Sequence, residues 1–179
     1  MSGHNKWSKI KHKKAATDAA RSKVFSKYAQ AIVVAVKNAG GDINSPSVQV
    51  VVDKAKKDNM PKDNIEKALK KGSGDGAAAL EEVVYEGYGP GGCGMIIVAF
   101  TDNRNRTGQE VKHVFSKNGS SLGAQGSVSW GFAKNEELDW VANEGTGIQL
   151  SEQDEKKLEK IMEEFEELDD VSDVYVNAL

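Results

Sequence analysis

Gly94-Met-Ile-Ile-Val-Ala-Phe-Thr101 is a continuous apolar run in a chain of 179 residues. A run of this length and composition is typical of a strand buried on both faces at the centre of a sheet. The turn residues Gly89-Pro-Gly-Gly92 separate it from another strand that we predict over 82–87. The C-terminal part of the chain is therefore expected to be built on a β-sheet.

After this run the predicted elements alternate. Thr107 and Glu110 fit a capping box, which predicts a helix from about residue 107 to Lys117. We predict a loop over 119–126, strands over 127–133, 137–142 and 171–176, and a helix capped by Ser151 before the last strand. The order β-β-α-β-β-α-β favours an α+β sandwich of the ferredoxin-like type, with one sheet and helices on one face.

The N-terminal part has helical periodicity. Its apolar spacing predicts one helix that ends at Gly40-Gly41, another that starts at Ser45-Pro46 and a third from about Met60-Pro61 to Gly72. Short connections between such helices indicate a three-helix bundle. We therefore predict a multi-domain α plus α+β protein, with a basic arm and bundle over 1–71, a glycine-rich linker over 72–80 and an α+β domain over 81–179.

Charge is divided along the same boundary. Residues 1–71 contain 16 Lys and Arg against 6 Asp and Glu, a net of +10. Residues 72–179 contain 8 against 21, a net of −13, although the whole chain carries only −3. Concentrated positive charge is the electrostatic signature of a polyanion binder, because it releases the counterions condensed on phosphates. The alternative is a solvated basic surface without a ligand.

We expect the basic arm and the exposed faces of the predicted helices to contact nucleic acid. In the arm, the Trp7 ring can stack on an unpaired base, and His12 can hydrogen-bond a phosphate. Lysine greatly outnumbers arginine here, which favours contact with the phosphate backbone over base reading. The predicted nucleic-acid-binding residues are Lys6, Trp7, Lys9, Lys11, His12, Lys13, Lys14, Arg21, Lys23, Lys27, Lys54, Lys56, Lys57, Lys62, Lys67, Lys70 and Lys71.

A further polar cluster follows the apolar run. It consists of Asn103, Arg104, Asn105 and Arg106, between the predicted strand and helix. One interpretation is a capping network that fixes the helix to the sheet. The other is an additional contact to phosphate or to a partner protein. The sequence leaves both open.

The sequence gives little support for a disulfide, a metal site, a membrane span or an enzyme. Cys93 is the only cysteine, which rules out an internal disulfide, and it fits a small core residue better than a nucleophile. His4 and His12 lack further ligands at metal-binding spacing, so we expect no metal and no cofactor. No apolar run approaches the ~20 residues of a membrane span, and we expect a cytoplasmic protein. An enzyme would depend on Cys93 and the polar cluster alone, and we expect none.

Longer motifs resemble the YebC/PmpR family. They are Gly3-His4, Lys6-Trp7, Ile10-Lys11-His12, Asn59-Met-Pro-Lys-Asp-Asn-Ile65, Tyr85-Glu-Gly-Tyr-Gly-Pro-Gly-Gly92, Thr101-Asp-Asn-Arg-Asn-Arg-Thr107 and Leu168-Asp-Asp-Val171. The resemblance implies a DNA-binding transcriptional regulator without enzymatic activity. It extends to a mitochondrial translational activator of cytochrome oxidase and to ribosome-associated factors. Family members usually carry an inserted third domain. In this chain only residues 133–150 occupy its place, so the chain resembles a member that lacks most of that domain.

Three functional hypotheses follow from the residues and the resemblance. The first is a non-enzymatic regulator of gene expression that binds DNA and works with the transcription machinery. The second is a translation factor that binds ribosomal RNA on the ribosome and relieves stalling. The third is a protein-interaction module whose basic and acidic parts dock against partners. None of the three involves a membrane.

Overall fold

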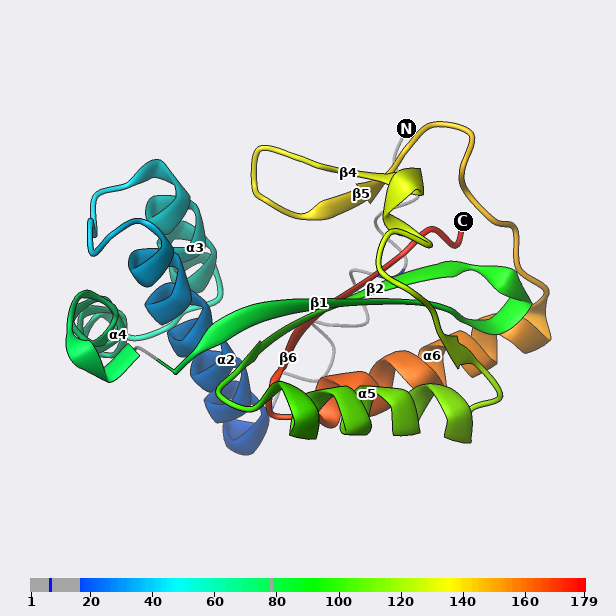
Figure 1. Cartoon of the computed structure of the whole chain (residues 1–179), viewed down its shortest axis with the longest axis horizontal. Coiled ribbons are helices and arrows are strands. Elements are labelled where there is room, and N and C mark those ends of the chain that lie inside the picture. Colours follow the sequence, from blue (N-terminus) through cyan, green and yellow to red (C-terminus); the bar gives the residue numbers. More distant parts are fainter. Residues whose placement is uncertain (1–6, 8–16, 78) are drawn as a thin grey trace. The chain divides into compact units, whose positions relative to one another are not determined.

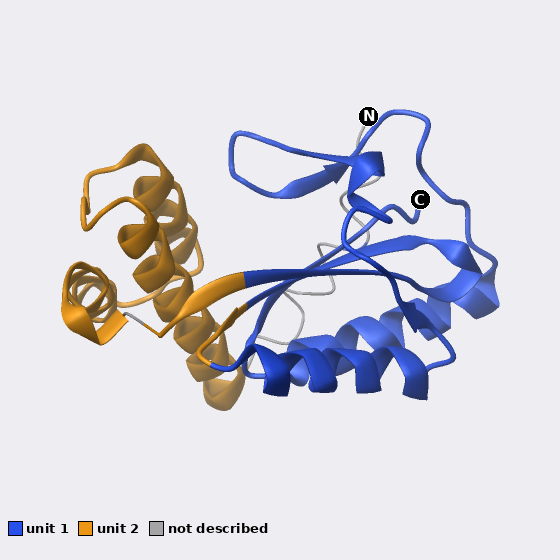
Figure 2. Cartoon of the chain, in the orientation of Figure 1, with its two compact units in different colours: residues 1–14, 83–99, 103–179 blue, residues 15–82, 100–102 orange. Residues whose placement is uncertain are grey.

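The computed structural model of the chain describes residue 7, residues 17–77 and residues 79–179. They form two compact units, coloured separately in Figure 2. Within the described residues, the helical unit consists of 17–77, 79–82 and 100–102. The α+β unit consists of Val83–Ala99 and Asn103–Leu179 together with Trp7.

The helical unit contains α2 (Asp18–Asn38), α3 (Pro46–Lys57), α4 (Lys62–Ser73) and the short 3₁₀ helix η1 (Asp75–Ala77). Thr17 caps α2 by accepting a hydrogen bond from the Ala20 backbone N–H at 3.2 Å. The helix α2 packs against both α3 and α4. Their inward faces, together with Met60 before α4 and Ala77 of η1, form one apolar core. Its other members are Ile32, Val33, Val36, Val48, Val52, Ala55, Ile65 and Ala68.

The predicted linker packs against this unit. The helix α4 continues to Ser73, η1 follows, and Ala77 is only 2% exposed. Gly72 lies where α2 and α4 approach closely, since a Cβ atom there would stand 2.7 Å from Val36 Cβ and 2.9 Å from the Val33 carbonyl oxygen. The helix ends one residue after the predicted Gly72, and Gly72 itself permits a close helix–helix contact.

The α+β unit is built on a sheet with the strand order β3-β1-β2-β6. Its strands are β1 (Glu81–Tyr88), β2 (Gly94–Thr101), β3 (Ser121–Leu122) and β6 (Val171–Val176). The 3₁₀ turn η2 (Pro90–Gly92) joins β1 to β2. The strands β1 and β3, and likewise β2 and β6, pair antiparallel. Figure 1 shows α5 (Arg104–Lys117) and α6 (Glu152–Glu167) on the same face of this sheet. The predicted α+β architecture is thereby confirmed.

Strand β2 is buried over all eight residues, as its apolar run predicts. Met95 and Ile97 pack in one core with the inward faces of α5 and α6. Phe115 and Phe165 join the two helices through an edge-to-face ring contact with centroids 5.0 Å apart. Asn177 accepts a hydrogen bond from the Gly94 backbone N–H through its side chain, at 2.7 Å. The core of the unit therefore lies between the sheet and its two helices.

Several elements differ from the sequence predictions. The helix α5 begins at Arg104, because the Asn103 side chain accepts a hydrogen bond from the Arg106 N–H at 3.1 Å and caps the helix earlier than Thr107. The predicted loop contains β3, and of the predicted 127–133 strand only residues 132 and 133 are extended, in β4 (Phe132–Lys134). It pairs with β5 (Trp140–Ala142) in a separate hairpin, so the strands form two sheets. None of the described helices has the length and apolar character to cross a membrane.

We expect Gly72→Ala to destabilise the helical unit by about 1–3 kcal/mol, although alanine is the better helix former. The added methyl group meets a β-branched side chain and a backbone carbonyl, and neither can move easily. Urea unfolding and amide hydrogen exchange in α2 and α4 would measure the effect. Gly76→Ala is the matched control, because a Cβ there meets nothing within 4 Å. Equal stabilities of the two variants would disprove the close contact.

Candidate nucleic-acid interface

The predicted cations of the helical unit lie on all three of its α-helices. Lys56, Lys57, Lys62, Lys67, Lys70, Lys71 and Arg21 are exposed, and Lys23, Lys27 and Lys54 are half-buried. Weak ion pairs within a helix join Arg21 to Asp18 at 3.7 Å and Lys62 to Glu66 at 3.6 Å. Ion pairs this exposed contribute little stability and are easily exchanged for contacts to a ligand.

Part of this charge also has a structural explanation. Lys54, Lys56 and Lys57 occupy the last turn of α3, and Lys70 and Lys71 the last turn of α4. Cations there interact favourably with the negative end of the helix dipole, by about 0.3–1 kcal/mol each. Two helix ends therefore concentrate positive charge on the surface of the unit, whatever ligand it binds.

Of the predicted contacts in the arm, the structure bears on Trp7 alone. Lys6, Lys9, Lys11, His12, Lys13 and Lys14 lie outside the described residues. Trp7 is described, and it is 5% exposed in the core of the α+β unit, with Met95, Ile97 and Phe115 in the same cluster. A ring buried in that core cannot also stack on a base. The large apolar area of an indole explains the preference for burial, so Trp7 is removed from the candidate interface in this structure.

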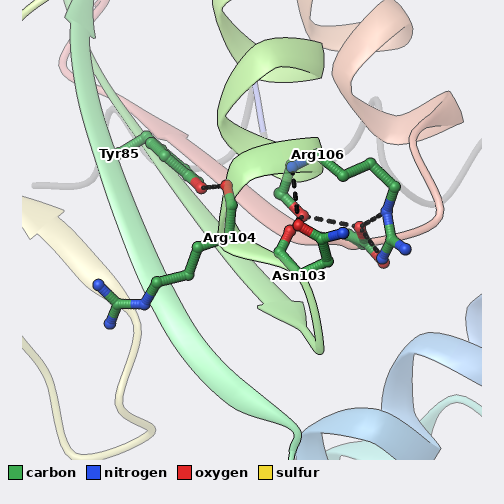
Figure 3. Close-up of polar contacts among 6 residues, drawn as sticks. Tyr85, Asn103, Arg104 and Arg106 are labelled. Atoms are coloured by element: carbon green, nitrogen blue, oxygen red, sulfur yellow. Dashed lines mark hydrogen bonds and ion pairs between the residues drawn. The ribbon is translucent and has the colours of Figure 1, made fainter.

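The polar cluster after β2 forms a capping network (Figure 3). Asp170 accepts hydrogen bonds from Arg106 Nη2 at 2.9 Å and from the Thr107 hydroxyl at 2.7 Å. The Thr107 hydroxyl also lies 3.2 Å from the Asn103 carbonyl oxygen. Asp170 directly precedes β6 and is 9% exposed, so these contacts tie the start of α5 to the start of the last strand. The structural interpretation of the cluster therefore holds for Asn103 and Arg106.

Arg104 is placed differently. Figure 3 shows its side chain extending away from the Arg106–Asp170 network, while its carbonyl oxygen accepts a hydrogen bond from the Tyr85 hydroxyl at 3.5 Å. Arg104 and Asn105 are both exposed. The Arg106 side chain is also partly exposed, but its guanidinium is held by Asp170. Within the cluster, Arg104 is therefore the arginine whose guanidinium lies outside the capping network.

We expect Arg106→Gln to destabilise the α+β unit by about 1–3 kcal/mol, because Asp170 would lose its charged partner in a buried position. Arg104→Gln should change stability by less than about 0.5 kcal/mol, as surface substitutions usually do. Urea unfolding followed by tryptophan fluorescence would compare the two. A larger loss for Arg104→Gln would reverse the assigned roles.

A buried carboxylate that the sequence pattern did not reveal organises the loop before β4. Glu86, 4% exposed on β1, accepts hydrogen bonds from the backbone N–H groups of Gly126, Val128 and Ser129 at 2.7–2.8 Å. Burial alone would raise the pKa of Glu86, but these hydrogen bonds outweigh it and hold the pKa below its ordinary value. Trp130, 72% exposed, donates its indole N–H to the Ser127 carbonyl oxygen of the same loop at 3.0 Å.

We expect Glu86→Gln to destabilise the α+β unit by about 1–3 kcal/mol at pH 7. A lowered folded-state pKa stabilises the protein above the unfolded pKa, and this contribution is lost as the pH falls through the folded pKa. The difference in unfolding free energy between wild type and variant should therefore shrink below pH 4.5, the ordinary pKa of a glutamate. Urea unfolding at a series of pH values would measure it, with exposed Glu82→Gln as control. A gap that is constant with pH would refute the ionic role.

Catalytic chemistry has few candidates in this structure. Burial raises the pKa of the Cys93 thiol to about 11, and the side chain is fully buried, so it is a neutral core thiol at neutral pH. Among the residues that the structure describes, no group of three His, Cys, Asp or Glu side chains is arranged to hold a metal ion.

Comparison with known proteins identifies relatives along the whole chain. A sequence model of the TACO1/YebC protein N-terminal domain matches residues 5–75, and one of the TACO1/YebC second and third domain matches residues 80–137 and 133–178. A probable transcriptional regulatory protein of Thermoanaerobacter pseudethanolicus is 38% identical over 99% of this chain and 97% of the relative. One of Fervidobacterium nodosum is 46% identical over 98% of this chain and 69% of the relative.

The fold has a solved counterpart. The crystal structure of a conserved hypothetical protein from Aquifex aeolicus matches with a TM-score of 0.79 and 34% identity, over 97% of this chain and 96% of that one. The regions matched by the two family models include the helical unit, the central sheet and the polar cluster after β2. The chain therefore belongs to the TACO1/YebC family.

Proposed function

We propose that this protein is a non-enzymatic regulator of gene expression that binds DNA through the basic surface of its helical unit. The observation that carries the proposal is the exposed lysine set of α3 and α4. The net charge of +10 over residues 1–71 includes these lysines together with the five lysines of the arm. Positive charge concentrated in this way attracts and neutralises a phosphate backbone. The relatives, named as probable transcriptional regulatory proteins, support regulation as the role.

The type of cation indicates how DNA is bound. Among the predicted cations of the helical unit, from Arg21 to Lys71, only Arg21 is an arginine and all the others are lysines. Lysine contacts phosphate as a mobile point charge, whereas the bidentate reading of guanine favours arginine. The proposed mode is therefore backbone contact with modest sequence preference. The acidic α+β unit would then repel DNA and is free to serve as the regulatory or docking part.

The absence of catalysis is part of the same proposal. The one cysteine is a buried neutral thiol, and Arg106 of the polar cluster after β2 forms an ion pair with Asp170. The names of the relatives point to regulation and not to a reaction.

We also propose that the β4–β5 hairpin takes the place of a longer segment in other family members. The alignment with the Thermoanaerobacter relative runs over 238 positions, more than the 179 residues of this chain. The model of the second and third domain matches in two pieces that meet at residues 133–137, inside the hairpin. A function that needs that segment is then performed differently, or not at all, by this protein.

The lysines of α4 provide the test. We expect the triple variant Lys67→Gln, Lys70→Gln, Lys71→Gln to bind random-sequence duplex DNA more weakly and with a shallower salt dependence. The slope of log K against log salt should fall by up to about 0.9 for each phosphate that the variant no longer neutralises. Fluorescence anisotropy at several salt concentrations, with the full chain, would measure both quantities.

Lys156→Gln, Lys157→Gln, Lys160→Gln is the matched control, because it removes the same charge from exposed positions of α6. Equal weakening in the two variants would show a nonspecific charge effect and refute the assignment. No binding by the wild type at low salt would refute DNA binding itself. Tighter binding to ribosomal RNA than to DNA at equal salt would replace DNA by RNA as the ligand.

A further inference from the structure

A groove of about 690 Å³ lies on the helical unit between α2 and α4. Its volume falls in the range of about 300–1,000 Å³ that is typical of small-molecule sites. Its lining residues are Asp18, Arg21, Ser22, Phe25, Ser26, Ala29, Gln30, Val33, Met60, Asn64, Lys67, Ala68, Lys71 and Leu80. All of them belong to the helical unit, so the groove is a feature of this unit alone.

Helical spacing sorts these residues into a floor and two walls. Phe25, Ala29 and Val33 recur every four residues along α2, and Met60 and Ala68 complete an apolar floor. Met60, Ala68 and Val33 are buried, whereas Phe25 is half-buried, packs against the core of the unit and also lines the groove. The floor therefore offers an aromatic ring and aliphatic surface to a flat ligand.

The walls carry hydrogen-bonding and charged groups. Ser22, Ser26 and Gln30 recur every four residues beside the floor on α2, and Asn64 stands on α4. Arg21, Lys67 and Lys71 supply three cations, all exposed, and Asp18 supplies one carboxylate, paired with Arg21 at 3.7 Å. Serine, amide and carboxylate groups are the ones that hydrogen-bond base edges, and the cations suit the flanking phosphates.

We propose that this groove binds an unpaired nucleotide of a single-stranded polynucleotide. The base lies on the apolar floor against Phe25, its edge faces the polar walls, and the adjacent phosphates contact Arg21, Lys67 and Lys71. Single-strand sites elsewhere combine the same two parts, a ring for stacking and cations along the backbone. The proposal rests on the proposed function, because it names the form of nucleic acid that the basic unit prefers.

An acidic amphipathic peptide would also be attracted by the three cations. Such a helix would need a continuous apolar stripe in the groove, with anchors spaced at three and four residues. Here polar groups of Ser22, Ser26, Gln30 and Asn64 line both walls and interrupt any such stripe. Hydrogen-bonding walls suit a base edge better than the aliphatic face of a helix.

The test compares a short single strand with the fully paired duplex of the same sequence, by fluorescence anisotropy with the full chain. We expect a preference for the single strand and quenching of a 2-aminopurine base placed in it. Phe25→Leu, which keeps apolar volume but removes the ring, should weaken single-strand binding about tenfold and duplex binding much less. RNA and DNA strands are tested separately, and the strand that the protein binds with higher affinity identifies the natural type of nucleic acid.

Two further variants keep the test independent of folding. Ser26→Glu changes an exposed wall residue, leaves the core untouched, and should also abolish the single-strand preference. Trp130→Leu removes an exposed ring from the α+β unit and should leave the preference intact. Loss of the preference in Trp130→Leu alone would overturn the assignment of the groove.

The remaining outcomes separate the groove from the proposed function. Duplex binding without any single-strand preference overturns the groove proposal and leaves the function standing. No binding to any nucleic acid at low salt overturns both. Binding of a glutamate-rich amphipathic peptide that depends on Phe25 and excludes the oligonucleotide assigns the groove to a protein partner and overturns the proposal.

Discussion

The complete burial of β2 is the constraint on which the α+β unit depends. A strand whose eight residues are all buried needs a hydrogen-bonded neighbour along each edge and an apolar layer over its faces. The neighbours are β1 and β6, and Met95 and Ile97 pack against the helices α5 and α6. Because β6 must return antiparallel along β2, the residues before β6 lie near the start of α5. This return brings Asp170 to Arg106 and Thr107.

Elements with a strong local signal were predictable from the sequence. The bounds of β2 and β6 agree with the predicted ranges, and Ser151 caps α6 as expected, accepting a hydrogen bond from the Asp154 N–H at 3.2 Å. In these segments the apolar period and the capping residue act over a few neighbouring positions. The helices of the N-terminal unit were predictable for the same reason, since glycine and proline residues lie next to their ends.

Features decided by distant partners were not predictable. Thr107 has the sequence of a capping residue, but its hydroxyl donates to Asp170, 63 positions away, and Asn103 caps the helix instead. Glu86 is an acidic residue on a strand, and only the backbone of residues 126–129, about forty positions later, makes its burial favourable. Trp7 lies in a basic segment, which indicates a ligand contact, but its ring belongs to the core of the α+β unit.

The same residue types therefore take structural or binding roles according to the partner that the fold supplies. Arg106 and Arg104 stand two positions apart in one motif, but only Arg106 reaches the buried carboxylate of Asp170. Trp7 is buried, whereas Trp130 is exposed and donates to a backbone carbonyl. For lysines the distinction is weaker, because a lysine in the last turn of α3 or α4 stabilises its helix and can still offer its ammonium group to a ligand. Helix stability therefore accounts for part of the positive charge of the helical unit, the part at the ends of α3 and α4, independently of any ligand.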